Sequence, residues 1–188
     1  MDFTTHYKSP IGDITLASDG DFLIGLWFDE QKYFGEILAV PRSELAQRTA
    51  EPHLASALAS ACPAPARQRD LPVFAEARRW LDIYFSGQKP AFTPPLLMRA
   101  TPFRKDVWEI LLTIPYGKTA TYGEIATALA QKRGVPRMSA QAVGNAVGHN
   151  AISLIIPCHR VIGANGNLTG YAAGLARKAW LLDLEKRL

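Results

Sequence analysis

Prolines divide this chain into two parts. The segment GQKPAFTPPLLMRATP, residues 87–102, holds four prolines in sixteen residues. Because proline removes a backbone donor and restricts the residue before it, no continuous helix can run through this segment. We therefore predict an N-terminal α/β support domain over residues 1–90, a linker over 91–101 and a C-terminal domain over 102–188. At 188 residues and 48% hydrophobic content the chain can form a core for both.

The N-terminal half predicts a small sheet and one helix. YKSPIGDITLASDGDFLIGLWF alternates and turns at Asp19-Gly20, which is typical of a strand hairpin. FAEARRWLDIYFSG has helical spacing and ends at Gly87, with an apolar face made of Phe74, Ala77, Trp80, Leu81, Tyr84 and Phe85. The Ala- and Pro-rich segment between them carries Cys62, which we interpret as an incidental thiol in a surface segment.

The C-terminal half predicts a helix-turn-helix. Thr101 is a candidate N-cap with Pro102 at the first helical position, and Thr121 lies three residues before Glu124, the spacing of a capping box. A basic loop, QKRGVPRMS, then leads to a second short helix over residues 139–149. Two short helices joined in this way are typical of a DNA-binding motif.

The second of these helices has unusually small side chains. Gly144 and Gly148 should each cost about 1 kcal/mol relative to alanine, and neighbours such as Ala142 add little packing. Another backbone must come close to compensate, either a neighbouring strand or a nucleic acid. A helix this slim fits the narrow minor groove of DNA.

Charge agrees with a nucleic-acid partner for the C-terminal half. Residues 96–188 carry 12 Lys and Arg against 5 Asp and Glu, whereas residues 1–95 carry 9 against 12. A basic domain indicates a polyanionic partner, although a solvated basic face gives the same composition. Two cysteines form neither a disulfide framework nor a zinc site, so a reduced compartment is expected, the cytoplasm or a eukaryotic nucleus. We expect neither a leader nor a membrane-spanning segment, because no positive stretch followed by a long apolar run stands in the first residues.

The stretch ISLIIPCHRVIG carries the candidate chemistry. ISLII predicts a buried strand, and Pro157 should end it and present Cys158 at a turn. An isolated cysteine is most often a small buried hydrophobe. A reactive thiolate needs a base within reach, and His159 is adjacent.

The last helix can supply a carboxylate to orient the histidine. In GLARKAWLLDLEKRL the predicted inward face holds Leu175, Ala179 and Leu182, flanked by Trp180, Leu181 and Leu184. Glu185 lies in the last turns, where the helix dipole disfavours an anion. It is either the orienting group or a surface glutamate paired with a neighbouring base.

Together these motifs resemble one family. IPYGKTATYGEIA, IPCHRVIG and NGNLTGYAAGLARKAWLLDLE are similar to the O6-alkylguanine-DNA alkyltransferases, or methylated-DNA:protein-cysteine methyltransferases, nearly continuously over residues 96–188. The resemblance implies an α+β protein: a small sheet-plus-helix domain and a mostly helical, winged-helix-like DNA-binding domain. It also implies irreversible transfer of an alkyl group from O6 of guanine, or O4 of thymine, to the protein, without cofactor and once per molecule.

The family's roles fall on matching positions of this sequence. The resemblance makes Cys158 the alkyl acceptor, His159 its base through a bridging water, Glu185 the holder of the imidazole and Tyr122 a donor to the departing guanine. It places the hinge at Asn150, the pocket wall at Tyr171 and the reading of the base edge at the backbone of Val161. We expect further DNA or substrate contacts from Arg160, Ala142 and Gly144. The substrate base would be flipped out of double-stranded DNA, because a lesion inside the stack is unreachable.

One position departs from the family pattern. The family usually has an arginine early in the second helix, which fills the gap left by the flipped base, and here that place is Gln141. We expect weaker DNA affinity or slower flipping, unless Arg137 substitutes. Some members hold zinc in the N-terminal domain, but His6, His53 and Cys62 are too few and scattered, so no metal is expected.

Two other functions stay open at this stage: a lesion-binding protein without efficient transfer, and a Cys-His-Glu hydrolase. A winged-helix regulator without chemistry leaves the Cys-His pair unexplained. We expect the protein to act as a monomer on alkylated double-stranded DNA, away from membranes.

Overall fold

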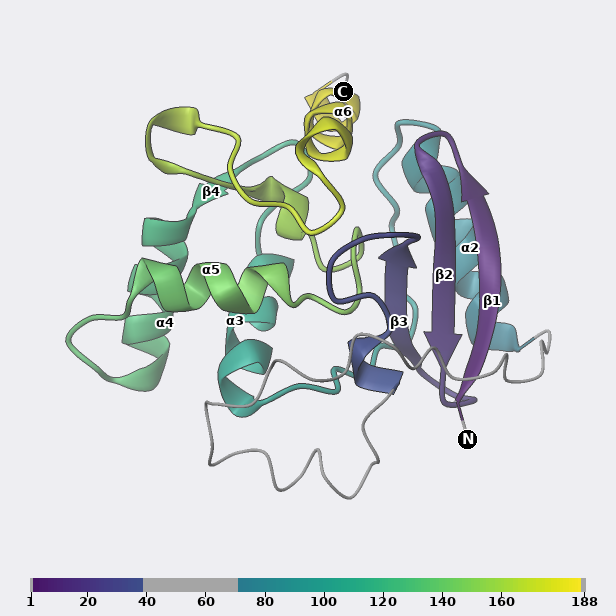
Figure 1. The fold of residues 1–188 in the computed structure, drawn as a ribbon, viewed down its shortest axis with the longest axis horizontal. Helices are drawn as coiled ribbons and strands as arrows, with labels where there is room; N and C mark the ends of the chain where they lie inside the picture. The colour runs from purple at the N-terminus through teal and green to yellow at the C-terminus, as the bar shows by residue number, and fades with distance from the viewer. Residues whose placement is uncertain (1, 39–70, 187–188) are drawn as a thin grey trace.

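The N-terminal half forms an antiparallel sheet. The computed structural model describes residues 2–38 and 71–186 (Figure 1). The strands are β1 (Phe3–Ser9), β2 (Gly12–Ser18) and β3 (Leu23–Phe28), in the order β1-β2-β3. The turn predicted at Asp19-Gly20 is confirmed, and a second turn at Pro10-Ile11 makes the hairpin a three-stranded meander. A short 3-10 helix, η1 (Glu36–Leu38), follows the sheet.

Helix α2 (Pro72–Phe85) packs against this sheet. Its buried residues are Val73, Phe74, Ala77, Trp80, Leu81 and Tyr84, which confirms the predicted face except that Phe85 is only half-buried. The Tyr84 side chain is fully buried, and its ring stacks on Trp80 with 5.2 Å between centroids. The predicted surface segment with Cys62 lies outside the described residues.

The C-terminal half is mostly helical. Its elements are α3 (Pro102–Leu112), β4 (Ala120–Thr121), α4 (Tyr122–Arg133), α5 (Ala140–Gly148), η2 (Cys158–Arg160), β5 (Val161–Ile162), η3 (Ala164–Gly166) and α6 (Leu175–Lys186). Strands β4 and β5 form a two-stranded parallel sheet. The result is the expected α+β architecture.

Both predicted helix starts are confirmed. Thr101 caps α3 by accepting a hydrogen bond from the Arg104 backbone N–H. Thr121 and Glu124 form a complete capping box at the start of α4, which ends at Gly134 in the left-handed conformation. Helices α3, α4 and α5 pack on one another, and α4 and α5 form the helix-turn-helix.

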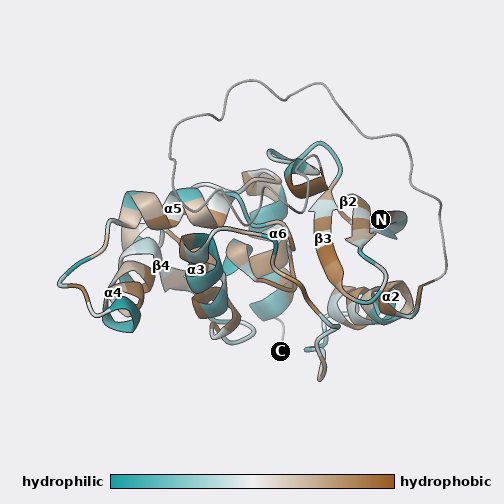
Figure 2. Cartoon of the chain, turned by 90° about the horizontal axis from the view of Figure 1, so that it is seen from below, coloured by the Kyte–Doolittle hydropathy of each residue, from teal (hydrophilic) through white to brown (hydrophobic). Residues whose placement is uncertain are grey.

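The edge of β3 joins the two halves of the molecule. Leu23 pairs with Leu96, which precedes α3, and Leu26 pairs with Ile152, just before the candidate site. The backbone N–H of Leu26 donates to Ala151 at 2.8 Å, and that of Ser153 donates to Leu26 at 2.8 Å. Figure 2 shows β3 coloured hydrophobic, and all six of its residues are buried. The sheet therefore continues into the segment that carries Cys158.

The predicted strand ISLII is wrong in form, although its burial is confirmed. Residues 152–156 are all buried, but only Ile152 makes a strand-like bridge, and the chain then coils into tight turns. Leu154 has a φ of 68°, and the Ile156 N–H donates to the Ile152 carbonyl at 3.0 Å. A short run of buried residues that are apolar except for Ser153 has no periodicity that distinguishes a strand from a buried turn.

The predicted inward face of α6 is also partly wrong. Leu175 and Ala179 are exposed, whereas Lys178 and Glu185 are buried beside Leu181 and Leu182. The buried positions keep helical spacing, but two of them are charged. The buried face of α6 therefore lies on a different side of the helix from the face predicted from apolar residues alone. None of the helices within residues 2–38 and 71–186 is long and apolar enough to cross a membrane.

Candidate active site

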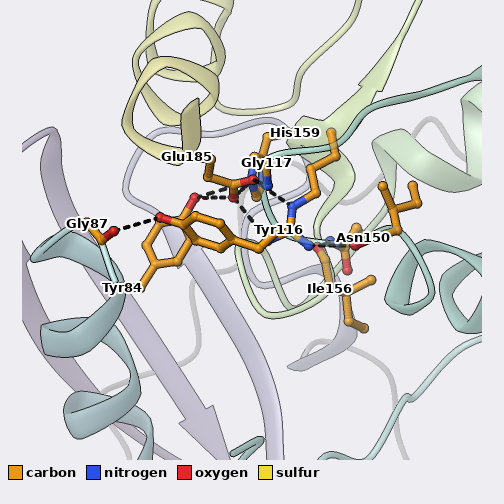
Figure 3. A network of polar contacts seen from close by, with 10 residues as sticks. Tyr84, Gly87, Tyr116, Gly117, Asn150, Ile156, His159 and Glu185 are labelled. Carbon is orange, nitrogen blue, oxygen red and sulfur yellow. Dashed lines mark hydrogen bonds and ion pairs between the residues drawn. The ribbon is translucent and has the colours of Figure 1, made fainter. Parts of the chain in front are cut away.

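Cys158 begins η2 directly after the buried turn. Its side chain is 3% exposed, and Asn150 holds it from the end of α5. The Asn150 Nδ2 group donates to the Cys158 Sγ at 3.1 Å and to the Ile156 carbonyl at 2.7 Å, while its Oδ1 accepts from the Ile152 N–H at 3.0 Å. The hinge role of Asn150 stays a prediction, but its hydrogen bonds connect the end of α5 to the buried turn and to the thiol. Figure 3 shows Asn150 beside Ile156 of that turn.

The thiol is held in its protonated form. Burial raises the pKa of Cys158 above its ordinary value, and the Asn150 hydrogen bond and the charge of Lys178 only partly oppose this. A buried thiol in this state reacts slowly on its own, because the thiolate is the nucleophile. The site needs a base at close range.

His159 and Glu185 form the buried pair expected of a base and its orienting group. The His159 Nε2 lies 2.7 Å from Glu185 Oε1, and both side chains are fully buried. An ionised carboxylate only accepts hydrogen bonds, so Nε2 carries the proton and Nδ1 carries the lone pair. Nδ1 has no hydrogen-bond partner among the described residues. The surface alternative for Glu185 is therefore wrong.

The Glu185 carboxylate is stabilised from several directions. Besides His159, it accepts from the Gly117 N–H at 3.0 Å, from Arg160 Nε at 2.9 Å and Nη2 at 3.0 Å, and from the Tyr84 hydroxyl at 2.8 Å. Although burial raises the pKa of Glu185, the hydrogen bonds from His159 and Arg160 and the positive charge of Arg160 outweigh it and lower that pKa to about 2. The carboxylate therefore stays ionised in the interior.

The structure reassigns Arg160. We expected a DNA or substrate contact, but its side chain is 10% exposed and bonds Glu185 and, through Nη1 at 2.7 Å, the Ile114 carbonyl. Because Nε, Nη1 and Nη2 of this guanidinium all donate to interior acceptors, the group cannot form a two-pronged hydrogen bond to a phosphate or a base. Arg160 serves to hold the carboxylate.

The imidazole of His159 is kept neutral. Burial lowers its pKa, and the charges of Arg160 and Lys178 act in the same direction, while Glu185 opposes them. A neutral imidazole with its Nδ1 lone pair available can accept a proton. The pair is therefore suited to remove the thiol proton of Cys158.

Two tyrosines lie beside the thiol. The Tyr122 hydroxyl donates weakly to the carbonyls of Thr169 at 3.4 Å and Gly170 at 3.3 Å, and burial together with the charge of Cys158 raises its pKa. The Tyr171 hydroxyl is buried without a partner among the described residues, and its pKa is also raised by burial and by Cys158. Both hydroxyls stay protonated, so both can donate to a ligand.

Lys178 shapes the loop around this space. Its fully buried ammonium group donates to the carbonyls of Val161 and Thr169, and burial lowers its pKa to about 8. We expected the backbone of Val161 to read a base edge, and this stays a prediction; its carbonyl accepts the bond from Lys178. The exposed loop over residues 164–170 is thereby connected to α6.

Helix α5 presents small residues outward. Gln141 is exposed in its first turn, and Ala142 and Gly144 are half-buried. A Cβ on Gly144 would meet the Tyr122 ring at 3.6 Å, whereas one on Gly148 would meet nothing within 4 Å. No neighbouring strand accounts for Gly148 within the described part of the chain, so that alternative is not supported. Ala146 faces the core, where its carbonyl accepts from the Trp108 indole at 2.9 Å.

Sequence reasoning misses the roles of Tyr84 and Lys178. The helical pattern places Tyr84 only on an apolar face, and it gives Lys178 no role. The one available signal for Lys178 is its spacing of seven residues from Glu185, which places both on one face of α6. Nothing in the sequence around Tyr84 indicates its polar partners.

A metal site is absent from the described residues. No group of three or more His, Cys, Asp or Glu side chains there is arranged to hold an ion. Of the three candidate ligands in the N-terminal half, His6 hydrogen-bonds Thr15, whereas His53 and Cys62 lie outside the described ranges.

Comparisons with known proteins cover both halves of the chain. Residues 3–98 match the family described as 6-O-methylguanine DNA methyltransferase, ribonuclease-like domain, and residues 102–187 match its DNA binding domain. A methylated-DNA–protein-cysteine methyltransferase from Mycobacterium bovis is 42% identical, covering 96% of this chain and 92% of the relative. The crystal structure of an O6-methylguanine methyltransferase from Mycobacterium tuberculosis is similar, with a TM-score of 0.72, 40% identity and coverage of 100% of this chain and 94% of that one.

A structure of OGT from the same organism in complex with DNA is also similar. Its TM-score is 0.71 at 38% identity, and the match covers 98% of this chain and 93% of that chain. The similarity therefore extends over the sheet, the helix-turn-helix and the segment that carries Cys158.

The site geometry predicts an acid-sensitive core. The Glu185 pKa, lowered from 4.5 to about 2, contributes stability that is fully present above pH 4.5 and is lost as the pH falls toward 2. The size of this contribution is roughly 3 kcal/mol. Glu185→Gln should destabilise the protein at pH 7 by about 3–5 kcal/mol, because it leaves Arg160 without its anion.

Urea unfolding at pH 7 and pH 3 measures both effects. The gap in unfolding free energy between wild type and Glu185→Gln should narrow at pH 3. Glu124→Gln is the control, since Glu124 is an exposed carboxylate whose pKa is also lowered and whose capping role glutamine can fill. A gap for Glu185→Gln that stays constant with pH would contradict this account.

Proposed function

The chain belongs to the 6-O-methylguanine DNA methyltransferase family, and on that premise we propose that Cys158 is the residue that takes the alkyl group. The protein is a methylated-DNA–protein-cysteine methyltransferase that binds DNA and acts in DNA repair. The observation that supports the proposal is the buried Cys158, His159 and Glu185 arrangement, with the thiol held by Asn150.

The first step activates the thiol. The Cys158 proton passes to the neutral Nδ1 of His159, through a bridging water, as the substrate enters. Glu185 stabilises the resulting imidazolium through Nε2, at 2.7 Å. The Asn150 amide at 3.1 Å and the nearby charge of Lys178 stabilise the thiolate. The site can therefore form an ion pair that its burial disfavours at rest.

The second step transfers the alkyl group. The thiolate attacks the alkyl carbon in line with the O6–C bond, an S–C bond forms, and the bonding electrons of the broken C–O bond go to the guanine. Tyr122, whose hydroxyl stays protonated, gives its proton to the leaving guanine. The imidazolium of His159 returns its proton to the Tyr122 oxygen through water, so the overall change is transfer of the thiol proton to guanine. The thioether product has no activated bond for water to break, so each molecule acts once.

Helix α5 is the element proposed to meet the DNA. Its small outward residues Ala142, Gly144 and Gly148 allow close approach to the minor groove, and Tyr171 is proposed to line the pocket that receives the flipped base. We propose that the protein acts as a monomer on double-stranded DNA with alkylated bases, in the cytoplasm or, in a eukaryote, the nucleus. The domain division at residues 91–101 is proposed on the proline content of that segment.

Replacing the acceptor sulfur tests the proposal directly. Cys158→Ser should take up no methyl group from DNA that contains O6-methylguanine, because the serine hydroxyl is a far weaker nucleophile, while binding of the same DNA persists. Mass spectrometry of the peptide that contains residue 158 measures the transfer, and a mobility-shift titration measures binding. Cys62→Ser is the matched control and should transfer as the wild type does.

Two outcomes would overturn the assignment. Methyl uptake by Cys158→Ser would place the acceptor elsewhere. Repeated turnover by the wild type, with the thiol recovered free, would favour the Cys-His-Glu hydrolase instead.

The glutamine in the first turn of α5 gives a second test. Gln141→Arg should accelerate transfer from duplex DNA and tighten binding, because the longer cation can fill the gap left by the flipped base and reach a phosphate. In a plot of the logarithm of the DNA-binding constant against the logarithm of salt concentration, the slope should become steeper by roughly 0.9 for each additional phosphate that the protein neutralises.

Gln88→Arg is the control for added charge, since Gln88 is exposed and lies outside the helix-turn-helix. Single-turnover repair rates and binding at several salt concentrations compare the three proteins. Equal rates for Gln141→Arg and wild type would mean that this position does not limit base flipping.

A further inference from the structure

Tyr84 brings the N-terminal half into the candidate active site. It lies near the end of α2, 75 residues before His159, and its side chain is fully buried. Its ring meets the His159 ring edge-on, with 6.2 Å between centroids, and the Tyr116 ring at 6.0 Å. An apolar residue would fill this position equally well if packing were its only purpose.

The Tyr84 hydroxyl shares one carboxylate oxygen with His159. It donates to Glu185 Oε1 at 2.8 Å, and the same oxygen lies 2.7 Å from His159 Nε2. The hydroxyl oxygen is itself 3.2 Å from Nε2, so the three groups form a closed triangle (Figure 3). Burial and the charge of Glu185 raise the pKa of Tyr84 well above its ordinary value, so the hydroxyl keeps its proton.

The position of this hydroxyl is fixed independently of the triangle. Helix α2 packs on the sheet, and the sheet is hydrogen-bonded through Leu26 to Ala151 and Ser153, which precede Cys158. The same sheet that carries α2 thus holds the turn that carries the thiol. The sheet, α2 and the turn before Cys158 therefore form one connected unit, and this unit sets the distance from Tyr84 to the His159 imidazole.

We propose that Tyr84 is a positioning residue for alkyl transfer, whose hydroxyl shares Glu185 Oε1 with His159 and so limits the negative charge that the imidazole faces. A donor on Oε1 weakens the pull of that oxygen on the Nε2 proton, which keeps the imidazole neutral and ready to accept the thiol proton. The hydroxyl also restrains rotation of the ring. This inference rests on the proposed function, because it assigns a role within the same reaction.

The other charges around His159 are accounted for. Glu185 and Lys178 face it from α6, Arg160 from η2, and Cys158 is its neighbour in the chain. The two cations disfavour the imidazolium and Glu185 favours it. Tyr84 is the group from α2 that modifies this balance without a charge of its own.

Tyr84→Phe tests the proposal, because it removes only the hydroxyl. Without that donor, Oε1 interacts more strongly with the Nε2 proton, and the pKa of His159 rises. The acidic limb of the plot of transfer rate against pH should move to higher pH by about one unit. At any fixed pH on that limb, the transfer rate should therefore fall by about tenfold. The DNA concentration for half-saturation should stay unchanged, since the hydroxyl is buried away from α5.

Tyr7→Phe is the matched control. The Tyr7 hydroxyl also donates to a carboxylate of α2, that of Asp82 at 2.8 Å, but in an exposed position rather than in the buried site. Single-turnover transfer at saturating methylated duplex from pH 4.5 to 8.5, a range that includes the acidic limb of a His159 pKa lowered from 6.5, is measured for wild type, Tyr84→Phe and Tyr7→Phe, with the thermal midpoint of each. Tyr7→Phe should keep the wild-type profile.

The outcomes separate this inference from the proposed function. An unshifted acidic limb in Tyr84→Phe, or a downward shift, overturns the role of Tyr84, even if the thermal midpoint falls. An equal shift in Tyr7→Phe would assign the effect to general loosening of α2 and would also overturn it. If the wild type takes up no methyl group, the proposed function itself fails.

Discussion

The buried carboxylate of Glu185 is the group on which the rest of this structure depends. An anion in the interior is tolerated only when it is paired and fully hydrogen-bonded. Here four donor residues come from three separate places: Tyr84 of α2, Gly117 before β4, and His159 with Arg160 of η2. Satisfying one carboxylate therefore fixes the relative positions of α2, α6 and the segment that carries the thiol.

In the proposed reaction, the same carboxylate lets the buried thiol be stable at rest and reactive when the substrate enters. At rest, burial keeps Cys158 protonated and His159 neutral, so the interior contains no unpaired charge from either group. Moving one proton creates two charges, and each has a partner already in place: Glu185 for the imidazolium and Asn150 with Lys178 for the thiolate. The preorganised partners lower the free energy of the ion pair without requiring rearrangement.

Much of the fold follows from local sequence, and much of the site does not. The caps at Thr101 and Thr121 and the end of α2 are predictable because they depend on a few neighbouring residues. The form of residues 152–156 is not predictable, because so short and mostly apolar a run has no period that separates a strand from a buried turn. Likewise Lys178 and Arg160 look like surface residues in the sequence, and only the three-dimensional placement of Glu185 and the loop carbonyls buries them.

The protonation state of His159 is the quantity that tests this account most directly. Nitrogen NMR of the imidazole ring in the wild type at pH 7 reports which nitrogen carries the proton. The account requires a neutral ring with the proton on Nε2, facing Glu185, and a free lone pair on Nδ1. An imidazolium at pH 7, or a neutral ring protonated on Nδ1, would mean that His159 cannot accept the Cys158 proton and would contradict the central claim.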